Sequence, residues 1–376
     1  MHLIIRTMTS KSAFLNMGLF LKQSFNSIVI RLMRFLGFYI ERMTSASLVY
    51  DKLTKDGLVL KENELRKTVN FLRRTNDLIM YDQILRKFIP QLDLHFSKNA
   101  FTGSGRGATT LNVYRKVTSD DNVLFEKVYF NSSLDIERVI WFYEAIYSSI
   151  KDYINVPPLY KVFRGELITV FYFNYVDLAL LSAKDIDSTI YSFSKELYKL
   201  SFTKVIKSRI ESAPSFLKDY KAHFEYKRKI KIAEQKIDEL LGDNFPLIDI
   251  EKLINDSPLV LTHGDIHPGN VFKNNYLIDW DPFGLYPIGL EVAYILLFLH
   301  NGALSYKDLI QLLEKEYRST LAAEHWDDFE LNCLYFYFVF TIQHVKEGVL
   351  CETQRNILAK LYELCCKRMN ILSLLN

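Results

Sequence analysis

The sequence is poor in cysteine, and the few cysteines that it has lie near its C-terminal end. Among 376 residues there are four, Cys333, Cys351, Cys365 and Cys366, and no two of them are spaced C-x-x-C. This pattern argues against a disulfide framework and indicates a reducing compartment. We therefore expect a cytoplasmic protein.

A strong charge of either sign is also missing. The 47 basic and 44 acidic residues leave a net charge of +3, which is too small an excess to indicate a nucleic-acid partner. Glycine and proline are scarce, with 14 and 9 residues, and we find no internal repeat. Hydrophobic residues make up 49% of the chain, which is enough for a folded core and argues against disorder.

No run of eighteen uncharged apolar residues occurs, which disfavours a membrane-spanning helix. The first forty residues contain no Asp or Glu, and their apolar residues recur at helical spacing from Phe14 to Tyr39. This pattern predicts a basic amphipathic helix. Residues 1–42 then either contact an anionic membrane at its cytoplasmic face or dock on the protein itself. A transit peptide or a later start also stays open.

The order of elements predicts an α+β fold with two unequal lobes. Strand-like segments at 111–117, 123–129 and 167–176 surround one helix that begins near Ser132, in capping-box spacing with Asp135, and ends near Ile150. Mostly helical patterns follow. We expect four parts: a basic segment at 1–45, a helical extension at 46–100, a β-rich N-lobe at 101–176 and a helical C-lobe at 177–376.

The most informative stretch is Leu261 to Asn270, which reads L-T-H-G-D-I-H-P-G-N. His263, Asp265 and Asn270 have the H-x-D-x-x-x-x-N spacing of a kinase catalytic loop. Phosphoryl transfer needs a carboxylate near the acceptor hydroxyl and oxygen ligands for Mg²⁺, and these residue types supply both. His263 and His267 have zinc-like spacing as well, but Pro268 and Gly269 exclude the helix that such a pair would need.

A hairpin is predicted directly after this loop. Val271-Phe272 and Tyr276-Leu277-Ile278 flank Lys273-Asn274-Asn275, and asparagine tolerates the left-handed conformation of tight turns. Pairing of the two strands would bring Asp279 back beside Asn270 and complete one metal site.

The stretch from Leu261 to Asp281 resembles the aminoglycoside phosphotransferase and choline kinase group of the protein-kinase-like superfamily. The resemblance implies a bilobal kinase-like fold that uses ATP and Mg²⁺. It implies that Asp265 is the catalytic base and that His263 braces the loop. It also implies that Asn270 and Asp279 are the metal ligands, with Asp281 as a second acid. The resemblance covers residues 101–376 and says nothing about the residues before them.

The same resemblance assigns the nucleotide-binding residues of the N-lobe. They are Gly103, Ser104, Gly105 and Gly107 in a Gly-rich loop, Lys127 on a strand, Glu144 on the helix, and Asn174 and Val176 at the hinge. Glycines allow backbone amides to approach phosphates. A charged residue in a strand pattern is unusual, and for Lys127 the resemblance implies pairing with the nucleotide phosphates and a helix carboxylate. Glu137 is the alternative carboxylate partner of Lys127, and a solvent-facing lysine is the alternative for Lys127 itself.

We therefore expect an ATP-dependent phosphotransferase that acts on a hydroxyl group of a small molecule. The many basic residues between Lys204 and Lys231 favour a neutral or anionic acceptor, such as a sugar or glycan, over a cationic one. An amino alcohol stays open. The alternatives are a kinase that acts on proteins and a nucleotide-binding pseudokinase that serves as an interaction module.

Overall fold

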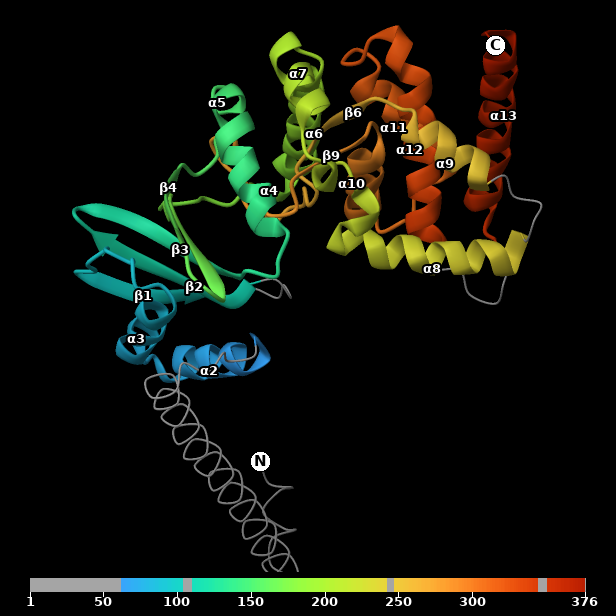
Figure 1. Cartoon of the computed structure of the whole chain (residues 1–376). Helices are drawn as coiled ribbons and strands as arrows, with labels where there is room; N and C mark the ends of the chain where they lie inside the picture. The colour runs from blue at the N-terminus through green and yellow to red at the C-terminus, as the bar shows by residue number, and fades with distance from the viewer. Residues whose placement is uncertain (1–61, 104–109, 242–246, 344–349, 376) are drawn as a thin grey trace, which may run out of the picture. The chain divides into compact units, whose positions relative to one another are not determined.

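The computed structural model of the chain describes residues 62–103, 110–241, 247–343 and 350–375 (Figure 1). They form two compact units. One contains the residues up to Ser132 and Lys161–Tyr172, and the other contains Ser133–Tyr160 and the residues from Phe173 onward. The predicted segment at 1–45 lies outside the described residues, as do Ser104, Gly105 and Gly107 of the Gly-rich run.

The first unit is built on a five-stranded sheet. Its strand order is β1 (Lys98–Gly103), β2 (Thr110–Ser119), β3 (Asn122–Phe130), β5 (Ile168–Asn174) and β4 (Leu159–Arg164). Strands β1, β2 and β3 pair antiparallel. Between β2 and β3, Asp120 and Asp121 adopt φ angles of 47° and 66°, as a two-residue hairpin turn requires. The turn predicted at 119–122 is therefore confirmed.

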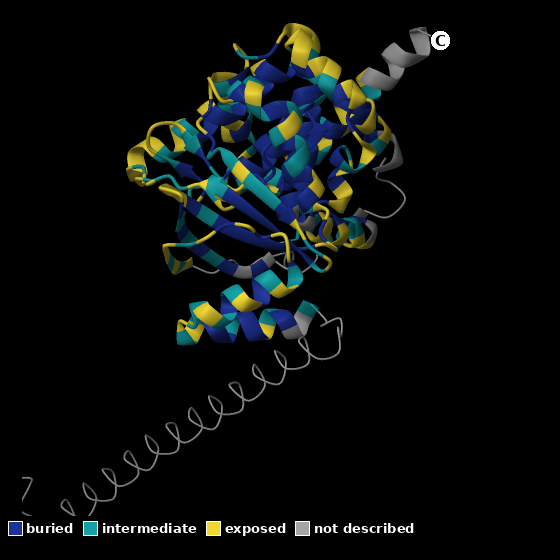
Figure 2. Cartoon of the chain, turned by 60° about the vertical axis from the view of Figure 1, so that its left-hand side comes forward, coloured by how far each residue is buried: buried dark blue, intermediate teal, exposed yellow. Residues whose placement is uncertain are grey.

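Two helices, α2 (Glu62–Thr75) and α3 (Leu78–Phe88), cover one face of this sheet (Figure 1). In α2, Leu65, Val69 and Leu72 are buried at helical spacing, while the other sides of both helices include exposed residues (Figure 2). Their apolar residues join the core formed by the sheet. The helices are therefore part of the folded unit that carries β1–β5.

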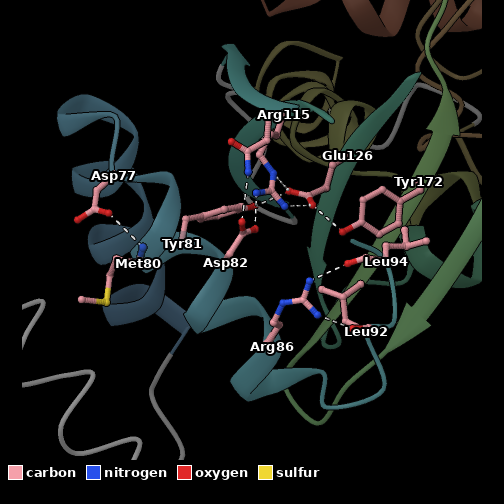
Figure 3. Close-up of polar contacts among 11 residues, drawn as sticks. Asp77, Met80, Tyr81, Asp82, Arg86, Leu92, Leu94, Arg115, Glu126 and Tyr172 are labelled. Carbon is pink, nitrogen blue, oxygen red and sulfur yellow. Dashed lines mark hydrogen bonds and ion pairs between the residues drawn. The ribbon is translucent and has the colours of Figure 1, made fainter. Parts of the chain in front are cut away.

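A buried ion pair fastens α3 to the sheet (Figure 3). Arg115 on β2 and Glu126 on β3 lie directly opposite in the strand register, and two guanidinium nitrogens of Arg115 bond the carboxylate at 2.6 and 3.0 Å. From α3, Tyr81 donates its hydroxyl to Glu126 at 3.0 Å, and Asp82 also bonds Arg115. On β5, the Tyr172 hydroxyl donates to Glu126 at 2.7 Å. This network was not predicted from the sequence, although two opposite charges within strand patterns were a signal for it.

The helix predicted from Ser132 to Ile150 is present, and it has three parts. These are α4 (Asp135–Trp141), a π-helical turn (Phe142–Ile146) and α5 (Tyr147–Ile150). The predicted capping box is wrong. The Ser133 hydroxyl accepts the Asp135 N–H, while the Ser132 hydroxyl donates to Glu62 in the first unit. The Ser132 hydroxyl is thus bonded to a residue of α2, which is distant in sequence, and does not cap α4.

The second unit is mostly helical. Its longer helices are α6 (Ala183–Ser201), α7 (Lys204–Ser212), α8 (Phe224–Leu241), α9 (Leu247–Asn255), α10 (Leu290–His300), α11 (Tyr306–Tyr317), α12 (Ala323–Ile342) and α13 (Glu352–Leu375). In α12 every residue from Leu331 to Ile342 is buried, as expected of a helix at the centre of a core. A sheet-based unit followed by a helical region confirms the α+β prediction.

Short strands carry the predicted catalytic segment within this helical unit. Strand β6 (Leu259–Thr262) pairs antiparallel with β9 (Gly284–Pro287), and β7 (Val271–Phe272) pairs antiparallel with β8 (Tyr276–Leu277). The loop at 263–270 lies between β6 and β7. In the part of the chain that the structure describes, no helix has the length and apolarity needed to cross a membrane.

Candidate active site

The loop at 263–270 begins with a close approach of two backbone segments. Gly264 has a φ of +86°, and a side-chain Cβ at this position would lie 2.3 Å from the Pro282 carbonyl oxygen. Only glycine fits both the left-handed backbone and the contact. Strands β6 and β9 bring these segments together, so the start of the loop is held from both sides.

His263 joins the loop to the β7–β8 hairpin. Its Nε2 lies 2.9 Å from the carbonyl oxygen of Ile278, and its Nδ1 accepts the backbone N–H of Asp265 at 3.3 Å. These partners assign the proton to Nε2. Burial lowers the pKa of His263 to about 4, although the Asp265 charge acts in the opposite direction. His263 is thus a neutral side chain with both nitrogens engaged, which excludes the alternative of a zinc ligand.

Asp265 and Asn270 contact each other across the loop. The Asn270 Nδ2 donates to the Asp265 backbone oxygen at 2.9 Å and lies 3.4 Å from its carboxylate Oδ2. Asn270 is buried, whereas the Asp265 side chain is 20% exposed. The carboxylate is therefore held by the protein and also reachable by a substrate.

The hairpin returns the chain to Asn270 as predicted. Val271 pairs with Leu277, and the Ile278 N–H donates to the Asn270 carbonyl at 3.0 Å. At the turn, Asn274 and Asn275 both have a φ of 59°, the conformation expected of asparagine there. Asp279 follows immediately, is exposed and has a φ of +68°. The hairpin thus brings Asp265, Asn270 and Asp279 into one short segment.

The donor set fits Mg²⁺. Because Asn270 donates through Nδ2 to Asp265, its amide oxygen is the atom left to face a cation, and Asp279 adds a carboxylate. Mg²⁺ commonly takes one or two protein carboxylates and completes its shell with water and phosphate oxygens. In the ranges that the structure describes, no group of three or more His, Cys, Asp and Glu residues could hold a metal ion by itself.

Glu291, at the start of α10, lies behind the loop. Its Oε1 accepts the Gly264 N–H at 2.7 Å, and the Tyr226 hydroxyl donates to the carbonyl of the same glycine at 3.0 Å. Burial raises the pKa of Glu291 to about 8. Helices α8 and α10 thus bond both backbone polar groups of Gly264, and Glu291 supports the loop structurally.

A buried arginine supports the segment after the hairpin, and the sequence gave no local signal for it. Arg138 on α4 donates to the Phe283 carbonyl at 2.9 Å, to the Tyr286 hydroxyl at 2.8 Å and to the Phe216 carbonyl at 2.9 Å. His223 stacks on Tyr226 nearby, and burial together with the charge of Arg138 lowers the pKa of His223 to about 3. Helix α4 is thereby tied to the catalytic segment.

The predicted nucleotide-binding residues are only partly described. Gly103 ends β1 at an irregularity in the strand register, and Lys127 is buried with its ammonium over the rings of Tyr114 and Tyr129 at 5.7 and 5.3 Å. These contacts correct the alternative of a solvent-facing lysine, because aromatic rings on the same sheet face cover the side chain.

The helix and hinge residues stay predictions. Glu144, in the π-helical turn, and the alternative Glu137 are both exposed, and they belong to a different unit from Lys127. The Asn174 N–H at the end of β5 donates to the Pro158 carbonyl at 2.8 Å, and Val176 follows in a loop. A nucleotide at this hinge would therefore have to use other backbone groups than the Asn174 N–H.

Comparison with known proteins supports the resemblance. Residues 200–323 match the model of the phosphotransferase enzyme family, a range that contains the loop at 263–270, the hairpin and α10. The predicted resemblance is therefore confirmed for this part of the chain. No curated protein sequence matches the chain.

Solved structures with similarity to the chain include three phosphotransferases. A Plasmodium vivax ethanolamine kinase is 14% identical with a TM-score of 0.42, over 82% of this chain and 96% of that one. A macrolide 2′-phosphotransferase type I is 14% identical with a TM-score of 0.43, over 76% and 97%. A choline kinase from Cryptosporidium parvum is 13% identical with a TM-score of 0.40, over 78% and 96%.

Proposed function

We propose that this chain, whose residues 200–323 match the phosphotransferase enzyme family, transfers the γ-phosphoryl group of ATP to a hydroxyl of a small molecule. Asp265 is the proposed base, and Asn270 and Asp279 are the proposed metal ligands. One observation carries most of this proposal, namely the convergence of the three residues. Asn270 donates to Asp265, and the residue before Asp279 bonds back to Asn270. A base and two oxygen ligands in one segment are what phosphoryl transfer requires.

In the proposed reaction, the acceptor oxygen forms a bond to the γ-phosphorus of ATP. The bond between this phosphorus and the oxygen that bridges the β- and γ-phosphates breaks, and ADP leaves with its electron pair. Asp265 orients the acceptor hydroxyl and accepts its proton. Because the protein makes no covalent bond of its own, the rate depends on how well these groups are positioned.

The proposed metal site would use the Asn270 amide oxygen and the Asp279 carboxylate. When bound, Mg²⁺ supplies positive charge that neutralises the phosphate oxygens during transfer. Gly103 and Lys127, with Ser104, Gly105 and Gly107 outside the described residues, are the proposed contacts of the nucleotide phosphates.

For the acceptor we propose a hydroxyl of a sugar or glycan, with an amino alcohol as the second candidate. Helices α7 and α8 carry exposed basic residues, among them Lys204, Lys207, Lys227 and Arg228. Positive charge near a site disfavours cationic acceptors and favours neutral or anionic ones.

A panel of acceptors tests the proposal. ATP turnover and phosphorylated products are measured with neutral sugars, sugar phosphates, amino alcohols and aminoglycosides, for the wild type and for Asp265→Asn. We expect one class to be phosphorylated, and we expect Asp265→Asn to lose at least about 100-fold in turnover, as removal of a general base typically does. Nucleotide binding should survive, since the metal ligands are unchanged.

Three results would contradict the proposal. Turnover of Asp265→Asn within a few-fold of the wild type would exclude Asp265 as the base. Phosphorylation of a protein substrate, with no small molecule accepted, would favour the protein-directed kinase. ATP binding without any turnover would instead favour the pseudokinase.

A further inference from the structure

One face of α10 contacts the catalytic loop at three successive places. Glu291 accepts from the backbone of Gly264, the Tyr294 hydroxyl lies 3.5 Å from Asp265 Oδ1, and the Phe298 ring stacks on His267 with centroids 5.2 Å apart. Residues 291, 294 and 298 are three and seven positions apart, so they share one side of the helix. The helix therefore runs alongside the loop and contacts both its start and its middle.

The contacts of Asp265 divide its two carboxylate oxygens between different donors. Oδ1 faces the Tyr294 hydroxyl at 3.5 Å, whereas Oδ2 faces Asn270 Nδ2 at 3.4 Å and His267 Nε2 at 3.5 Å. These distances are at the outer limit of hydrogen bonding. Catalytic hydrogen bonds are often long before substrate binds and shorten in the complex.

The orientation of His267 is also set by the protein. Its Nδ1 accepts the Gly269 N–H at 3.0 Å, which assigns the ring proton to Nε2, the nitrogen that faces Asp265. The Phe298 ring packs nearly parallel to the imidazole, with 29° between the planes. Phe298, which packs on His267, is 46% exposed, whereas Tyr294, which faces Asp265 directly, is 5% exposed.

We propose that Tyr294 and His267 are positioning residues that fix the rotation of the Asp265 carboxylate; this inference rests on the proposed role of Asp265 as the base. The last torsion of an aspartate side chain is broad and is not set by its own rotamer preference. Donors on both oxygens remove this freedom. Each acceptor hydroxyl then approaches the same Asp265 carboxylate oxygen from the same direction. This fixed orientation contributes to the rate.

The test compares variants that remove one donor at a time. Turnover of Mg·ATP is measured with water alone as the acceptor and with the panel compound that the wild type phosphorylates fastest. We expect Tyr294→Phe and His267→Leu each to lower kcat about tenfold, the scale of one hydrogen bond to a charged group, with the KM for ATP unchanged. His267→Gln, whose amide nitrogen can replace Nε2, should recover most of the loss. ATP binding by each variant shows that it is folded.

Tyr191→Phe is the matched control. Tyr191 lies on α6, and its hydroxyl lies 3.2 Å from His300 Nε2 at the C-terminal end of α10, so the variant removes a buried tyrosine hydroxyl that contacts this helix away from the loop. We expect its kcat to stay at the wild-type value.

The outcomes separate this inference from the proposed function. An active Asp265→Asn variant would overturn the proposed base itself. If Asp265→Asn is inactive but Tyr294→Phe and His267→Leu keep kcat within twofold of the wild type, the positioning role is wrong. Equal losses in Tyr191→Phe and Tyr294→Phe, or in His267→Gln and His267→Leu, would also overturn it, because they would indicate packing rather than the donors.

Discussion

Glu291 and His263 support the same turn of backbone around Gly264, and burial shifts their pKa values in opposite directions. The pKa of His263 falls to about 4, and that of Glu291 rises to about 8. In both cases the neutral form is favoured, because an ionised group loses its hydration when it is buried. At neutral pH this part of the site is therefore held by uncharged side chains, while the proposed metal ligand Asp279 is exposed.

The first prediction concerns stability above neutral pH. The raised pKa of Glu291 means that its contribution to stability is complete below about 4.5 and is lost as the pH rises toward 8. His263 and His223 act at lower pH, where stability falls as the pH drops below their ordinary value of 6.5. Between pH 6.5 and 8, the free energy of unfolding should thus fall by up to about 1.4 kcal/mol per pH unit because of Glu291.

Glu291→Gln should flatten this fall, because glutamine retains the acceptor for the Gly264 N–H and cannot ionise. Urea denaturation at several pH values measures the effect, with Glu239→Gln on the exposed side of α8 as the control. A fall of the same steepness in the wild type and in Glu291→Gln would show that another group is responsible.

The second prediction concerns the metal. Asp279→Ala should lose most of the dependence of ATP binding on Mg²⁺, since it removes the carboxylate of the proposed site. A nucleotide titration with and without Mg²⁺ measures this, with Asp281→Ala as the comparison. If Asp279→Ala keeps the full metal dependence and Asp281→Ala loses it, then Asp281 is the ligand.

The third prediction concerns the buried pair in the first unit. Arg115→Met would leave Glu126 charged and buried without its cation, and we expect a loss of about 3–5 kcal/mol in the free energy of unfolding. The double variant Arg115→Met/Glu126→Leu should recover part of this, with a remainder because the Tyr81 and Tyr172 hydroxyls lose their acceptor.

Lys161→Met provides the control for this cycle. Lys161 and Asp93 form an ion pair in the same unit at 2.9 Å, but both side chains are well exposed. Its removal should leave the free energy of unfolding almost unchanged, because solvent screens an exposed ion pair. An equally small change in Arg115→Met would contradict the role assigned to the buried pair.

The fourth prediction concerns truncation from the N-terminus. Deleting residues 1–42 should preserve ATP turnover, because all the proposed catalytic and nucleotide-binding residues lie beyond residue 100. Deleting residues 1–90 should abolish soluble expression, because it removes α2 and α3 and uncovers Glu126, Arg115 and the apolar face of the sheet. Thermal melts of both truncated proteins, with sedimentation on anionic vesicles for the shorter deletion and the full chain, check this. A folded, active protein without residues 1–90 would contradict it.

The candidate site was largely predictable because its signals are local. Asp265, Asn270 and Asp279 lie within 15 positions, and the asparagines of the turn directly specify the hairpin that joins them. Proline and glycine excluded a helix there. The residue types, the spacing and the turn chemistry thus all acted over a few residues, where sequence patterns are most informative.

The supports of the site were not predictable in this way. Tyr294 reaches Asp265 from 29 positions away, and Arg138 reaches Phe283 from 145. Adjacent residues of a strand, such as Glu126 and Lys127, point to opposite faces, but strand alternation does not indicate which face α3 covers. Such contacts depend on how helices pack in three dimensions, and a single sequence does not contain this information locally.

The neighbouring charges of Glu126 and Lys127 have a consequence for folding. A slip of β3 by one residue against β2 would place Lys127 opposite Arg115 and turn Glu126 to the other face. Helix α3 would then have to bury two cations with Asp82 but without Glu126, and Tyr81 would lose its acceptor. A hairpin paired in the wrong register therefore cannot receive the helix. Only correctly paired strands therefore allow α3 to dock. The adjacent charges of Glu126 and Lys127 thus disfavour the slipped register.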